Sequence, residues 1–572
     1  MIIIKTGRNL SRNRTITQAM MLALICSICM VPGDLTAQSD VVETQTKQPP
    51  ARDAFETPKK EHHRADLLHV SIPVDSSELV LLPPLKASEL STESSDPLQA
   101  APKKIPVSLH RNLDPIPVHY WRTFFRPDGK VSLRIVVHSP GAIFIRPHFK
   151  EFDAQKFSVY LYGENGLRTV RGPVNVPASP GGRGLWGPII EGQYLHVEVV
   201  QNSVTPSSQI IIDKISHGYR NPVTGLTQEY AENSKVASCH KDVNCYSGWN
   251  SAKKSVARMY FEENQSGYVC TGTLLMDKAE SFRNWFLTAY HCISSDRVAE
   301  TLIAFFNYRT GTCNGAPPDI SDSPTASGAN FKVGSSHLSG TDFSLLLLNE
   351  DPPNDAIYSG WTTARLSAGE AVTTIHHPGG SFQRISFANE DDLSSTLSDW
   401  WYVKYYLGST EGGSSGAPLF RNSTQQLTGQ LYGGTAACSN MDGHDWYGRF
   451  GESWNDGLSK FLQSPYLTLH QSKSDSNPIY YVGDLLEIWT CVENPVSQRV
   501  IYETVWAGPR KTRSEADNIL LEDTGYRCFE IYAERIRKNE VDGQYSVALT
   551  FRDPASNEEY TTDSIQFRID SR

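Results

Sequence analysis

Alternating hydrophobic and polar positions predict β-strands in two regions of the chain. In the first region, residues 131–137, 157–162 and 194–200 alternate with a period of two, and turns rich in Gly and Pro separate them. Short strands of this kind are typical of a β-sandwich. We therefore expect an N-terminal β-sandwich over residues 106–235.

The second alternating region lies towards the C-terminal end, over residues 464–572. Residues 486–491 alternate strictly and residues 545–551 less strictly. Cys491 and Cys528 are the two cysteines of this region, and we expect them to pair. The pattern predicts a small Ig-like β-sandwich.

The chain between and before these sandwiches has a different pattern. Residues 236–463 have short strand signals and frequent glycines, and residues 454–462 predict a helix. Residues 38–105 are rich in Pro, Ser, Glu, Lys and Thr with little periodicity, which is typical of a mostly disordered linker. A chain of 572 residues is too long for one compact domain, so several domains are expected.

Residues 1–37 have the pattern of a signal peptide. A basic start is followed by an uncharged apolar run over residues 19–31, and Ala37 supplies a small residue for cleavage before Gln38. The apolar run is shorter than the roughly 20 residues that span a bilayer, and no later segment is apolar enough to cross one. We expect a soluble protein outside the cytoplasm, either secreted or periplasmic.

Charge and cysteine content exclude several classes of protein. The formal net charge of −10 argues against a general nucleic-acid-binding protein, which would usually be basic. Beyond residue 37 the chain has an even number of cysteines, which indicates disulfides in an exported protein. No CxxC pair recurs, so a zinc site is unexpected, and we predict no other metal or cofactor.

Three strings in the middle segment predict nucleophilic catalysis. They are FLTAYHC with His291, GTDFSLL with Asp342, and GGSSGAP with Ser415. A serine hydroxyl is a weak nucleophile and needs a base that takes its proton. Ser415 would attack, His291 would accept the proton and later donate it to the leaving amine, and Asp342 would orient the imidazole. Their order along the chain is that of the chymotrypsin-like serine proteases.

The neighbours of Ser415 supply the remaining parts of such a site. Glycines allow a sharp backbone turn, and the N–H groups of Gly413 and Ser415 would form the oxyanion hole. Losing one such donor typically costs about 3 kcal/mol of transition-state stabilisation. Three further histidines are rival bases, of which the first two precede a proline and favour a structural or subsite role: His376, His377 and His444.

Residues 239–463 resemble the lysyl endopeptidases, which are secreted bacterial proteases of the chymotrypsin-like class. The matching strings are CTGTL from Cys270, the histidine string, SLL after Asp342, HHP from His376, TE before the nucleophile turn, GQL from Gly429 and YGR from Tyr447. The resemblance covers less than half of the chain and neither flank.

The resemblance implies a mostly β fold with two packed β-barrels and the catalytic residues at their junction. The two predicted sandwiches would then flank a chymotrypsin-like catalytic domain. The resemblance also implies three disulfides, namely Cys239–Cys438, Cys245–Cys313 and Cys270–Cys292. From the sequence alone, fifteen connectivities of these six cysteines are open.

The acid of the primary specificity pocket is expected after the nucleophile. Trypsin-type enzymes place it six residues before the serine, where this chain has Ser409. The resemblance points to Asp445 instead. Two alternatives stay open: Asp445 is a residue of a surface turn, or Asp442 is the pocket acid. A buried carboxylate is costly until a cation neutralises it, and a lysine ammonium would do so.

The pocket wall departs from the family pattern in one residue. The string Gln430-Leu431-Tyr432-Gly433-Gly434 has Tyr432 where the family typically has a histidine. Tyrosine keeps an aromatic wall but would not titrate near neutral pH. We expect lysine preference to persist, with Tyr432, Gly433 and Gly434 contacting the substrate. Trp400 or Trp401 is a candidate second wall.

The start of the catalytic segment predicts how the protein matures. Lys235 and Val236 lie just before Cys239, where the mature family enzymes begin, so a lysine-specific protease would cut its own precursor there. The trypsin-type zymogen switch needs an aspartate at position 414, where this chain has Ser414. Removal of the N-terminal sandwich would therefore act by uncovering the cleft or by releasing a folding aid. A carbohydrate-binding role for that sandwich stays open.

These patterns together predict a secreted serine endopeptidase that cuts after lysine, made as a precursor and acting as a monomer on protein or peptide substrates. A broader Lys/Arg specificity, or another primary specificity, is the alternative within the same enzyme class. A non-catalytic adhesin or binding protein on a protease scaffold is the alternative from a different class.

Overall fold

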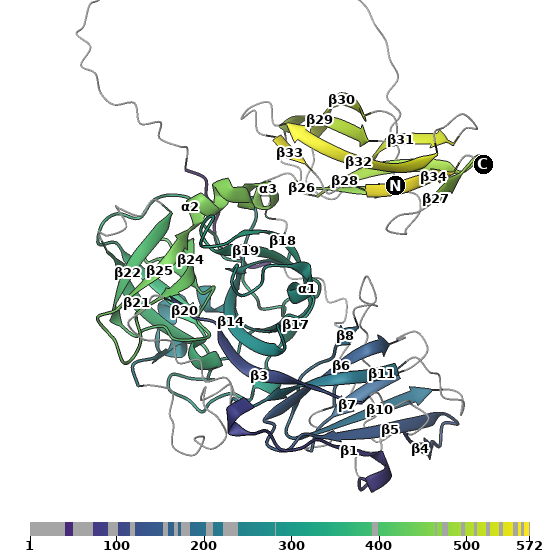
Figure 1. Ribbon diagram of the computed structural model, residues 1–572. Coiled ribbons are helices and arrows are strands. Elements are labelled where there is room, and N and C mark those ends of the chain that lie inside the picture. Colours follow the sequence, from purple (N-terminus) through teal and green to yellow (C-terminus); the bar gives the residue numbers. More distant parts are fainter. Residues whose placement is uncertain are drawn as a thin grey trace, which may run out of the picture. The chain divides into compact units, whose positions relative to one another are not determined.

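The computed structural model of the chain is built almost entirely of β-strands (Figure 1). It describes residues 41–49, 72–89, 101–114, 121–152, 158–164, 170–172, 184–201, 210–220, 238–278, 280, 282–391, 399–463, 466–471, 479–493, 498–507, 512–521, 527–536, 542–552, 559–561 and 565–570. Residues Val42–Ser464 form one compact unit, and the described residues after Pro465 belong to a second. Within the described part of the chain, no helix has the length and apolar character that crossing a membrane requires.

The N-terminal part of the first unit is a β-sandwich. One sheet consists of β1 (Leu79–Leu81), β4 (Arg122–Phe125), β5 (Val131–His138), β7 (Ser158–Tyr162) and β10 (Tyr194–Gln201). The facing strands are β3 (Ile105–Asn112), β6 (Phe144–Phe152), β8 (Leu185–Trp186), β9 (Ile190–Glu191) and β11 (Ile210–Gly218). One buried cluster joins both layers, for example Val197 of β10 with Ile145 and Ile215. Alternation correctly predicted three of these strands, β5, β7 and β10, whose apolar side chains lie in that core.

The first barrel of the middle segment, residues 236–463, adjoins this sandwich. Its strands are β13 (Val256–Glu263), β14 (Ser266–Leu274), β15 (Trp285–Ala289), β16 (Ile303–Phe305), β17 (Thr325–Ser327), β18 (Ala329–Ser335) and β19 (Phe343–Leu348), with the short helix α1 (Asp296–Ala299) beside them. Their apolar faces form a second core around Phe286, Leu346 and Met259.

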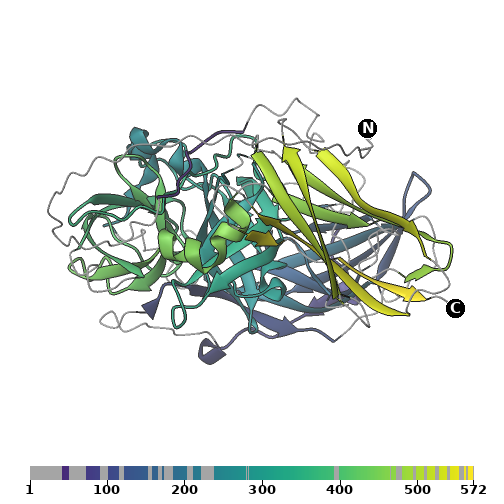
Figure 2. The ribbon, with the colours of Figure 1, turned by 90° about the horizontal axis from the view of Figure 1, so that it is seen from above.

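The second barrel is a closed ring. The strands β20 (Ala371–His376), β21 (Arg384–Glu390), β22 (Trp400–Leu407), β25 (His444–Arg449), β24 (Leu427–Gly434) and β23 (Pro418–Arg421) pair in that order, and β23 pairs back with β20. β12 (Lys241–Asp242) extends the ring at β21. A helical segment follows, made of α2 (Phe450–Ser453), the π-turn η13 (Trp454–Leu458) and α3 (Ser459–Leu462), seen as the green coil in Figure 2. It begins earlier than the predicted residue 454, and Gly457 interrupts it at φ 129°.

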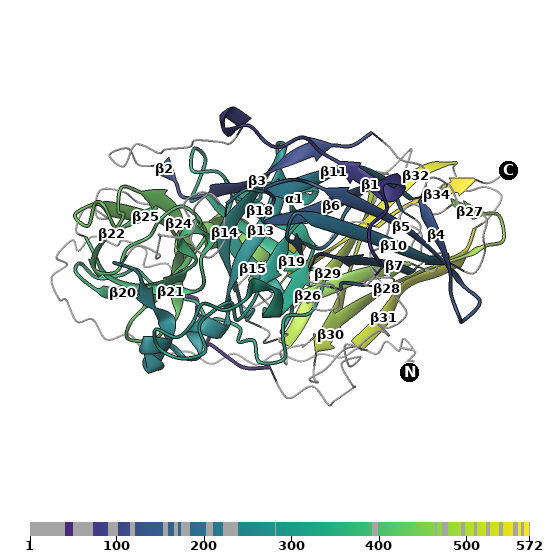
Figure 3. The same cartoon turned by 90° about the horizontal axis from the view of Figure 1, so that it is seen from below.

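Strand β3 joins the sandwich to the first barrel. It pairs antiparallel with β11 of the sandwich over residues 108–112 and with β14 of the barrel over residues 105–109. A single 12-stranded sheet therefore runs through both parts, which Figure 3 shows from below.

The segment predicted as a mostly disordered linker contains ordered structure in its described parts. The 3₁₀ turns η2 (Ser76–Glu78) and η3 (Ala87–Glu89) and the strands β1 and β2 (Ala101–Pro102) lie within residues 38–105. Composition favoured disorder, but these pieces gain their order from distant partners, because β1 pairs with β5 and β2 pairs with β24. Near its start, Glu43 and Lys47 form β-bridges with Thr362 and Tyr358 of the middle segment.

Three disulfides join the cysteines that the resemblance had paired: Cys239–Cys438, Cys245–Cys313 and Cys270–Cys292.

In the second compact unit, β26 (Tyr466–Gln471), β28 (Leu485–Glu493) and β31 (Arg527–Arg535) form one sheet. β27 (Ile479–Tyr481), β29 (Gln498–Ala507), β30 (Thr512–Leu521), β32 (Gly543–Arg552), β33 (Glu559–Thr561) and β34 (Ile565–Asp570) form the other. Cys491 and Cys528 are directly opposite in the β28–β31 ladder. Their side chains lie outside the described part, so that disulfide stays a prediction.

Candidate active site

His291, Asp342 and Ser415 meet where the two barrels adjoin. His291 follows β15 and Asp342 precedes β19, both in the first barrel, whereas Ser415 precedes β23 of the second. The imidazole Nε2 of His291 lies 2.7 Å from Ser415 Oγ, and its Nδ1 lies 2.6 Å from Asp342 Oδ2. The backbone N–H of His291 also donates to Asp342 Oδ1 at 3.0 Å.

This geometry fixes the direction of proton transfer. The buried Asp342 carboxylate can only accept, so Nδ1 of His291 carries a proton and Nε2 is left as an acceptor facing the Ser415 hydroxyl. The Asp342 carboxylate also stabilises the imidazolium that would form on proton transfer. The three side chains can therefore act as nucleophile, base and orienting group.

The turn before Ser415 presents two N–H groups to one carbonyl oxygen. The amides of Gly413 and Ser415 donate to the carbonyl oxygen of Lys103 at 2.5 and 3.4 Å. Gly413 has φ 94°, and a Cβ there would lie 2.7 Å from the carbonyl oxygen of His377, so the turn requires glycine. The N–H pair that the sequence predicted as an oxyanion hole thus already holds a carbonyl group.

The rival histidines lie in other environments. His376 contacts Ser414 through Nδ1 at 2.8 Å, and Nδ1 of His377 donates to the Ser381 carbonyl at 2.9 Å. Burial lowers the pKa of His376 well below its ordinary value and the pKa of His377 to about 3, so both stay neutral. His444 stacks on Tyr402 and contacts Asp391.

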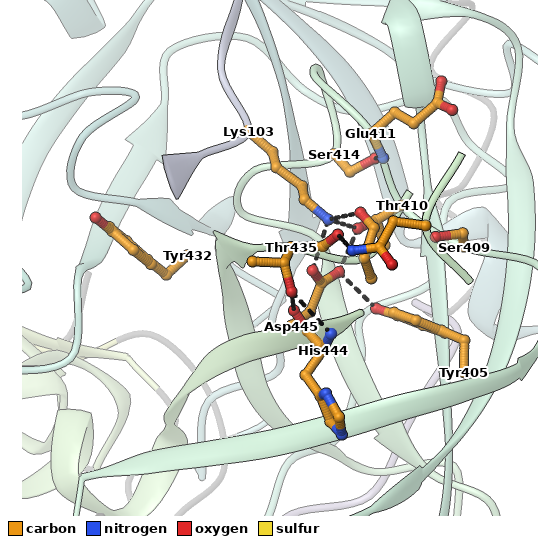
Figure 4. Close-up of polar contacts among 12 residues, drawn as sticks. Lys103, Tyr405, Ser409, Thr410, Glu411, Ser414, Tyr432, Thr435, His444 and Asp445 are labelled. Atoms are coloured by element: carbon orange, nitrogen blue, oxygen red, sulfur yellow. Dashed lines mark hydrogen bonds and ion pairs between the residues drawn. The ribbon is translucent and has the colours of Figure 1, made fainter. Parts of the chain in front are cut away.

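Asp445 is fully buried in a pocket next to this turn (Figure 4). It lies on β25, opposite Val403 of β22 and Gly434 of β24. Its Oδ1 accepts from the Lys103 ammonium at 2.6 Å. Its Oδ2 accepts from the Thr410 hydroxyl, and from the Tyr405 hydroxyl at 3.1 Å. Every oxygen of the carboxylate therefore has a partner.

The Lys103 ammonium has three acceptors within this pocket. Besides Asp445 it donates to Thr410 Oγ1 at 2.5 Å and to the Ala436 carbonyl at 2.7 Å. Burial lowers the pKa of Lys103 from its ordinary value, and the Asp445 carboxylate opposes that change. Three donors on an ammonium match three acceptors, so the buried cation is fully satisfied.

The two other acidic and polar candidates lie elsewhere. The Asp442 side chain is 96% exposed and pairs with Lys404 at 3.3 Å, so it faces solvent instead of the pocket. Ser409 is buried in the position of the trypsin acid, and its carbonyl accepts from Ser386 Oγ.

Aromatic rings surround Tyr432, whose carbonyl oxygen lies 3.3 Å from Ser415 Oγ. The ring centroid of Tyr432 lies 5.7 Å from that of His291, 5.6 Å from Trp400 and 4.9 Å from His337. Burial raises the pKa of Tyr432, which keeps its hydroxyl neutral. Trp401 lies instead in the core of the second barrel and donates to the Thr428 carbonyl.

Gly433 and Gly434 present their backbone to another segment of the chain. They are the partners of Pro102 and Ala101 in the β2–β24 pairing. A Cβ at Gly434, whose φ is 156°, would lie 2.5 Å from Asp445 Oδ1, so this position leaves no space for a side chain beside the acid.

Several functional contacts were not predicted from the sequence. Lys103, Tyr405 and His337 carry no motif of their own, and Thr410 entered only as part of a matching string. Lys235 and Val236, the predicted processing residues, lie outside the described residues.

Metal binding has no support among the described side chains. The two close groups of Cys and His are Cys239, His240 and Cys438, and Cys270, His291 and Cys292. Their cysteines are bonded in disulfides and offer no thiolate.

Comparison with known proteins agrees with this site. The family model described as lysyl endopeptidase, C-terminal domain, matches residues 233–448. The chain is 30% identical over 282 residues to a lysyl endopeptidase of Pseudomonas aeruginosa. That match covers 45% of this chain and 58% of the relative, so the chain spans less than two thirds of the relative's length.

Solved structures give weaker matches. Human heparin binding protein is 17% identical, with a TM-score of 0.27, over 36% of this chain and 92% of that protein. Deg5 is 12% identical, with a TM-score of 0.26, over 39% of this chain and 96% of that protein. These values are too low to establish a shared fold by themselves. The sequence matches confirm that residues 233–448 resemble the lysyl endopeptidases.

Proposed function

We propose that the chain is a secreted serine endopeptidase that hydrolyses peptide bonds on the carboxyl side of lysine and is made as a precursor. Ser415 is the nucleophile, His291 the general base and acid, and Asp342 the residue that orients His291. The N–H groups of Gly413 and Ser415 stabilise the oxyanion. Asp445 selects the substrate side chain.

One observation carries the choice of lysine. A lysine of the chain itself has its ammonium on Asp445 while its carbonyl oxygen accepts from Gly413 and Ser415. A substrate residue must satisfy both conditions at once, because the pocket sets specificity and the N–H pair activates the bond that is cut. The spacing between the two sites therefore suits a lysine side chain.

The acceptors of the pocket favour lysine over arginine. Asp445, Thr410 and the Ala436 carbonyl surround a single nitrogen, which suits a compact ammonium with three donors. An arginine guanidinium is larger and planar, and it distributes five donors in a rigid fork. Arginine would have to displace at least one of these acceptors.

The test compares two aspartates of the same strand region in the activated enzyme. Asp445→Asn keeps the size of the side chain but removes the charge, whereas Asp442→Asn changes an exposed acid outside the pocket. We expect the first variant to lose about 2–5 kcal/mol of transition-state stabilisation for lysyl bonds. This loss corresponds to a decrease in kcat/KM of roughly 30- to 5,000-fold. The second should match the unmodified enzyme.

Cleavage sites are mapped on a mixed peptide library, with fluorophosphonate labelling of Ser415 as a separate check of nucleophilicity. Cleavage after glutamate or aromatic residues by the unmodified enzyme would contradict the proposal. An unreactive Ser415 in the activated protein would instead favour the binding protein on a protease scaffold.

A further inference from the structure

Residues before Lys103 lie along the cleft as an added strand. β2 pairs antiparallel with β24, with Ala101 opposite Gly434 and Pro102 opposite Gly433. The backbone N–H of Lys103 continues this pairing by donating to the Tyr432 carbonyl at 3.4 Å. An extended peptide that adds a strand in this way gains main-chain hydrogen bonds while its side chains enter pockets on one side.

Residues after Lys103 cross to the first barrel. The Lys104 ammonium binds Glu263 Oε2 at 2.6 Å and the carbonyl oxygen of His291 at 2.8 Å. From Ile105 the chain forms β3, which pairs with β14. The chain before the Lys103–Lys104 peptide bond is therefore bound by the second barrel, and the chain after it by the first barrel.

The bond itself lies at the catalytic residues. Its carbonyl oxygen is held by the Gly413 and Ser415 amides, and the side chain that precedes it fills the Asp445 pocket. The residue that follows it is lysine, so the departing nitrogen would leave as a primary amine once it takes a proton.

We propose that the chain binds residues 101–104 of its own N-terminal region as a tethered substrate, and that Lys103–Lys104 is a self-cleavage site. This inference rests on the proposed function, and it adds a cut well upstream of the one predicted after Lys235. Until β2 and β3 leave, the same segment excludes other substrates from the cleft.

The reaction would proceed in two balanced steps. Ser415 Oγ bonds to the carbonyl carbon of Lys103 as His291 takes the hydroxyl proton. The bond from that carbon to the Lys104 nitrogen then breaks, and the proton passes to the departing amine. Water next attacks the ester, which releases the Lys103 carboxylate and returns the proton to Ser415.

The pairing of β3 predicts that this cut is slow. β3 is paired with β11 on one side and β14 on the other, so the new Lys104 amine stays beside the ester that it has just left. A tethered amine has a high effective concentration and competes with water for the ester. We therefore expect gradual cleavage and a precursor that is latent meanwhile.

The experiment follows the full-length precursor after purification. Intact-mass measurement and N-terminal sequencing over time should reveal a chain beginning at Lys104, and its rate of formation should not change on dilution. The Ser415→Ala precursor should not form it. Lys103→Gln should abolish this cut, and Lys103→Arg should slow it strongly. Lys86→Gln is the matched control, since Lys86 is an exposed lysine of the same N-terminal region outside residues 101–104, and this precursor should still be cut.

A second readout covers the possibility that Lys103→Gln folds poorly. Fluorophosphonate labelling of Ser415 in the precursor should be about tenfold faster or more for Lys103→Gln than for Lys86→Gln, because the ion pair with Asp445 is lost only in the former. Correct formation of the three disulfides in both variants shows that they fold.

The outcomes separate this inference from the proposed function. A precursor that cuts lysyl peptides after activation, never yields a Lys104 terminus and labels equally fast in both variants would overturn the self-cleavage site and leave the proposed function intact. A Lys104 terminus that forms in proportion to protein concentration would also overturn it, because the cut would then be between molecules. An activated enzyme that cuts no lysyl peptide would overturn the proposed function itself.

Discussion

At the scale of single residues, the site depends on buried polar groups that have every partner they need. Asp445 is the clearest case, because Lys103, Thr410 and Tyr405 satisfy both of its oxygens. An unpaired carboxylate at that depth would cost several kcal/mol. The pocket is therefore stable while a lysine occupies it, and an empty pocket must admit water or another cation.

The buried histidines make the domain sensitive to acid. Burial lowers the pKa of His377 to about 3, against about 6.5 in an unfolded chain. Between these values the unfolded state binds more protons, so the free energy of unfolding falls as the pH falls, by up to about 1.4 kcal/mol per pH unit for this group.

His377→Asn tests this contribution in the Ser415→Ala background, which prevents self-digestion. The asparagine amide can still donate to the Ser381 carbonyl, as Nδ1 of His377 does, but it does not titrate. Denaturant unfolding between about pH 6 and pH 4 should show a slope smaller by about 1 kcal/mol per pH unit than in the parent. If the free energy of unfolding changes equally with pH in the variant and the parent, protonation of His377 does not destabilise the folded state.

The proposed catalytic residues, whose side chains lie together in the structure, could be singled out from the sequence because each has a short local motif. The string around Ser415 requires glycines for its turn, and His291 and Asp342 lie at the end and start of apolar strands. Lys103 has no such motif, and its partner Asp445 is 342 positions away. No local sequence pattern encodes a contact over that separation, so the presence of Lys103 in the pocket could be recognised only in the folded structure.

At the scale of elements, β3 is the strand that holds the N-terminal region on the protease. Val107 at its centre is fully buried in a cluster with Tyr260, Val269 and Phe305 of the first barrel. The hydroxyl of Ser108 also contacts that of Tyr260 at 2.9 Å. Alternation predicts that such a strand exists but not which sheet it joins, because pairing partners lie far apart in sequence.

Val107→Asp should loosen this strand, because it introduces a carboxylate among apolar side chains without a partner. We expect fluorophosphonate labelling of Ser415 in the precursor to become about tenfold faster or more. Leu81→Asp is the control, since Leu81 is a strand residue of the same region that is 63% exposed. Equal labelling of both variants would show that β3 does not govern access to the cleft.

At the scale of the whole molecule, the sandwich and the two barrels of the first compact unit each have a buried core, and a further buried cluster around Val107 lies between the sandwich and the first barrel. One continuous sheet and the bound segment link these cores. The sandwich and the first barrel share the β11–β3–β14 ladder, and the second barrel holds β2. Alternation and motifs predicted the sandwich and the protease segment as separate domains. Their union depends on strand pairings between distant residues, which a local pattern does not encode.

Calorimetry can measure this union in the Ser415→Ala precursor. Shared strands should make the sandwich and the first barrel unfold together, in one transition, because neither can lose β3 without disturbing the other. Adding Val107→Asp should divide that transition into two, with the lower one for the sandwich. Two transitions in the parent would mean that the shared sheet does not couple the cores.

The Cys239–Cys438 bridge has a consequence for the timing of activity. It ties the start of the protease segment to the loop beside Ala436, whose carbonyl forms part of the pocket. A new chain end made nearby would be held at that loop by a covalent bond, and no insertion of a freed terminus is needed to build the pocket. Under the proposed function, the precursor is then a finished enzyme with its site filled, and the speed of activation is set by how fast the occupant leaves after the cut.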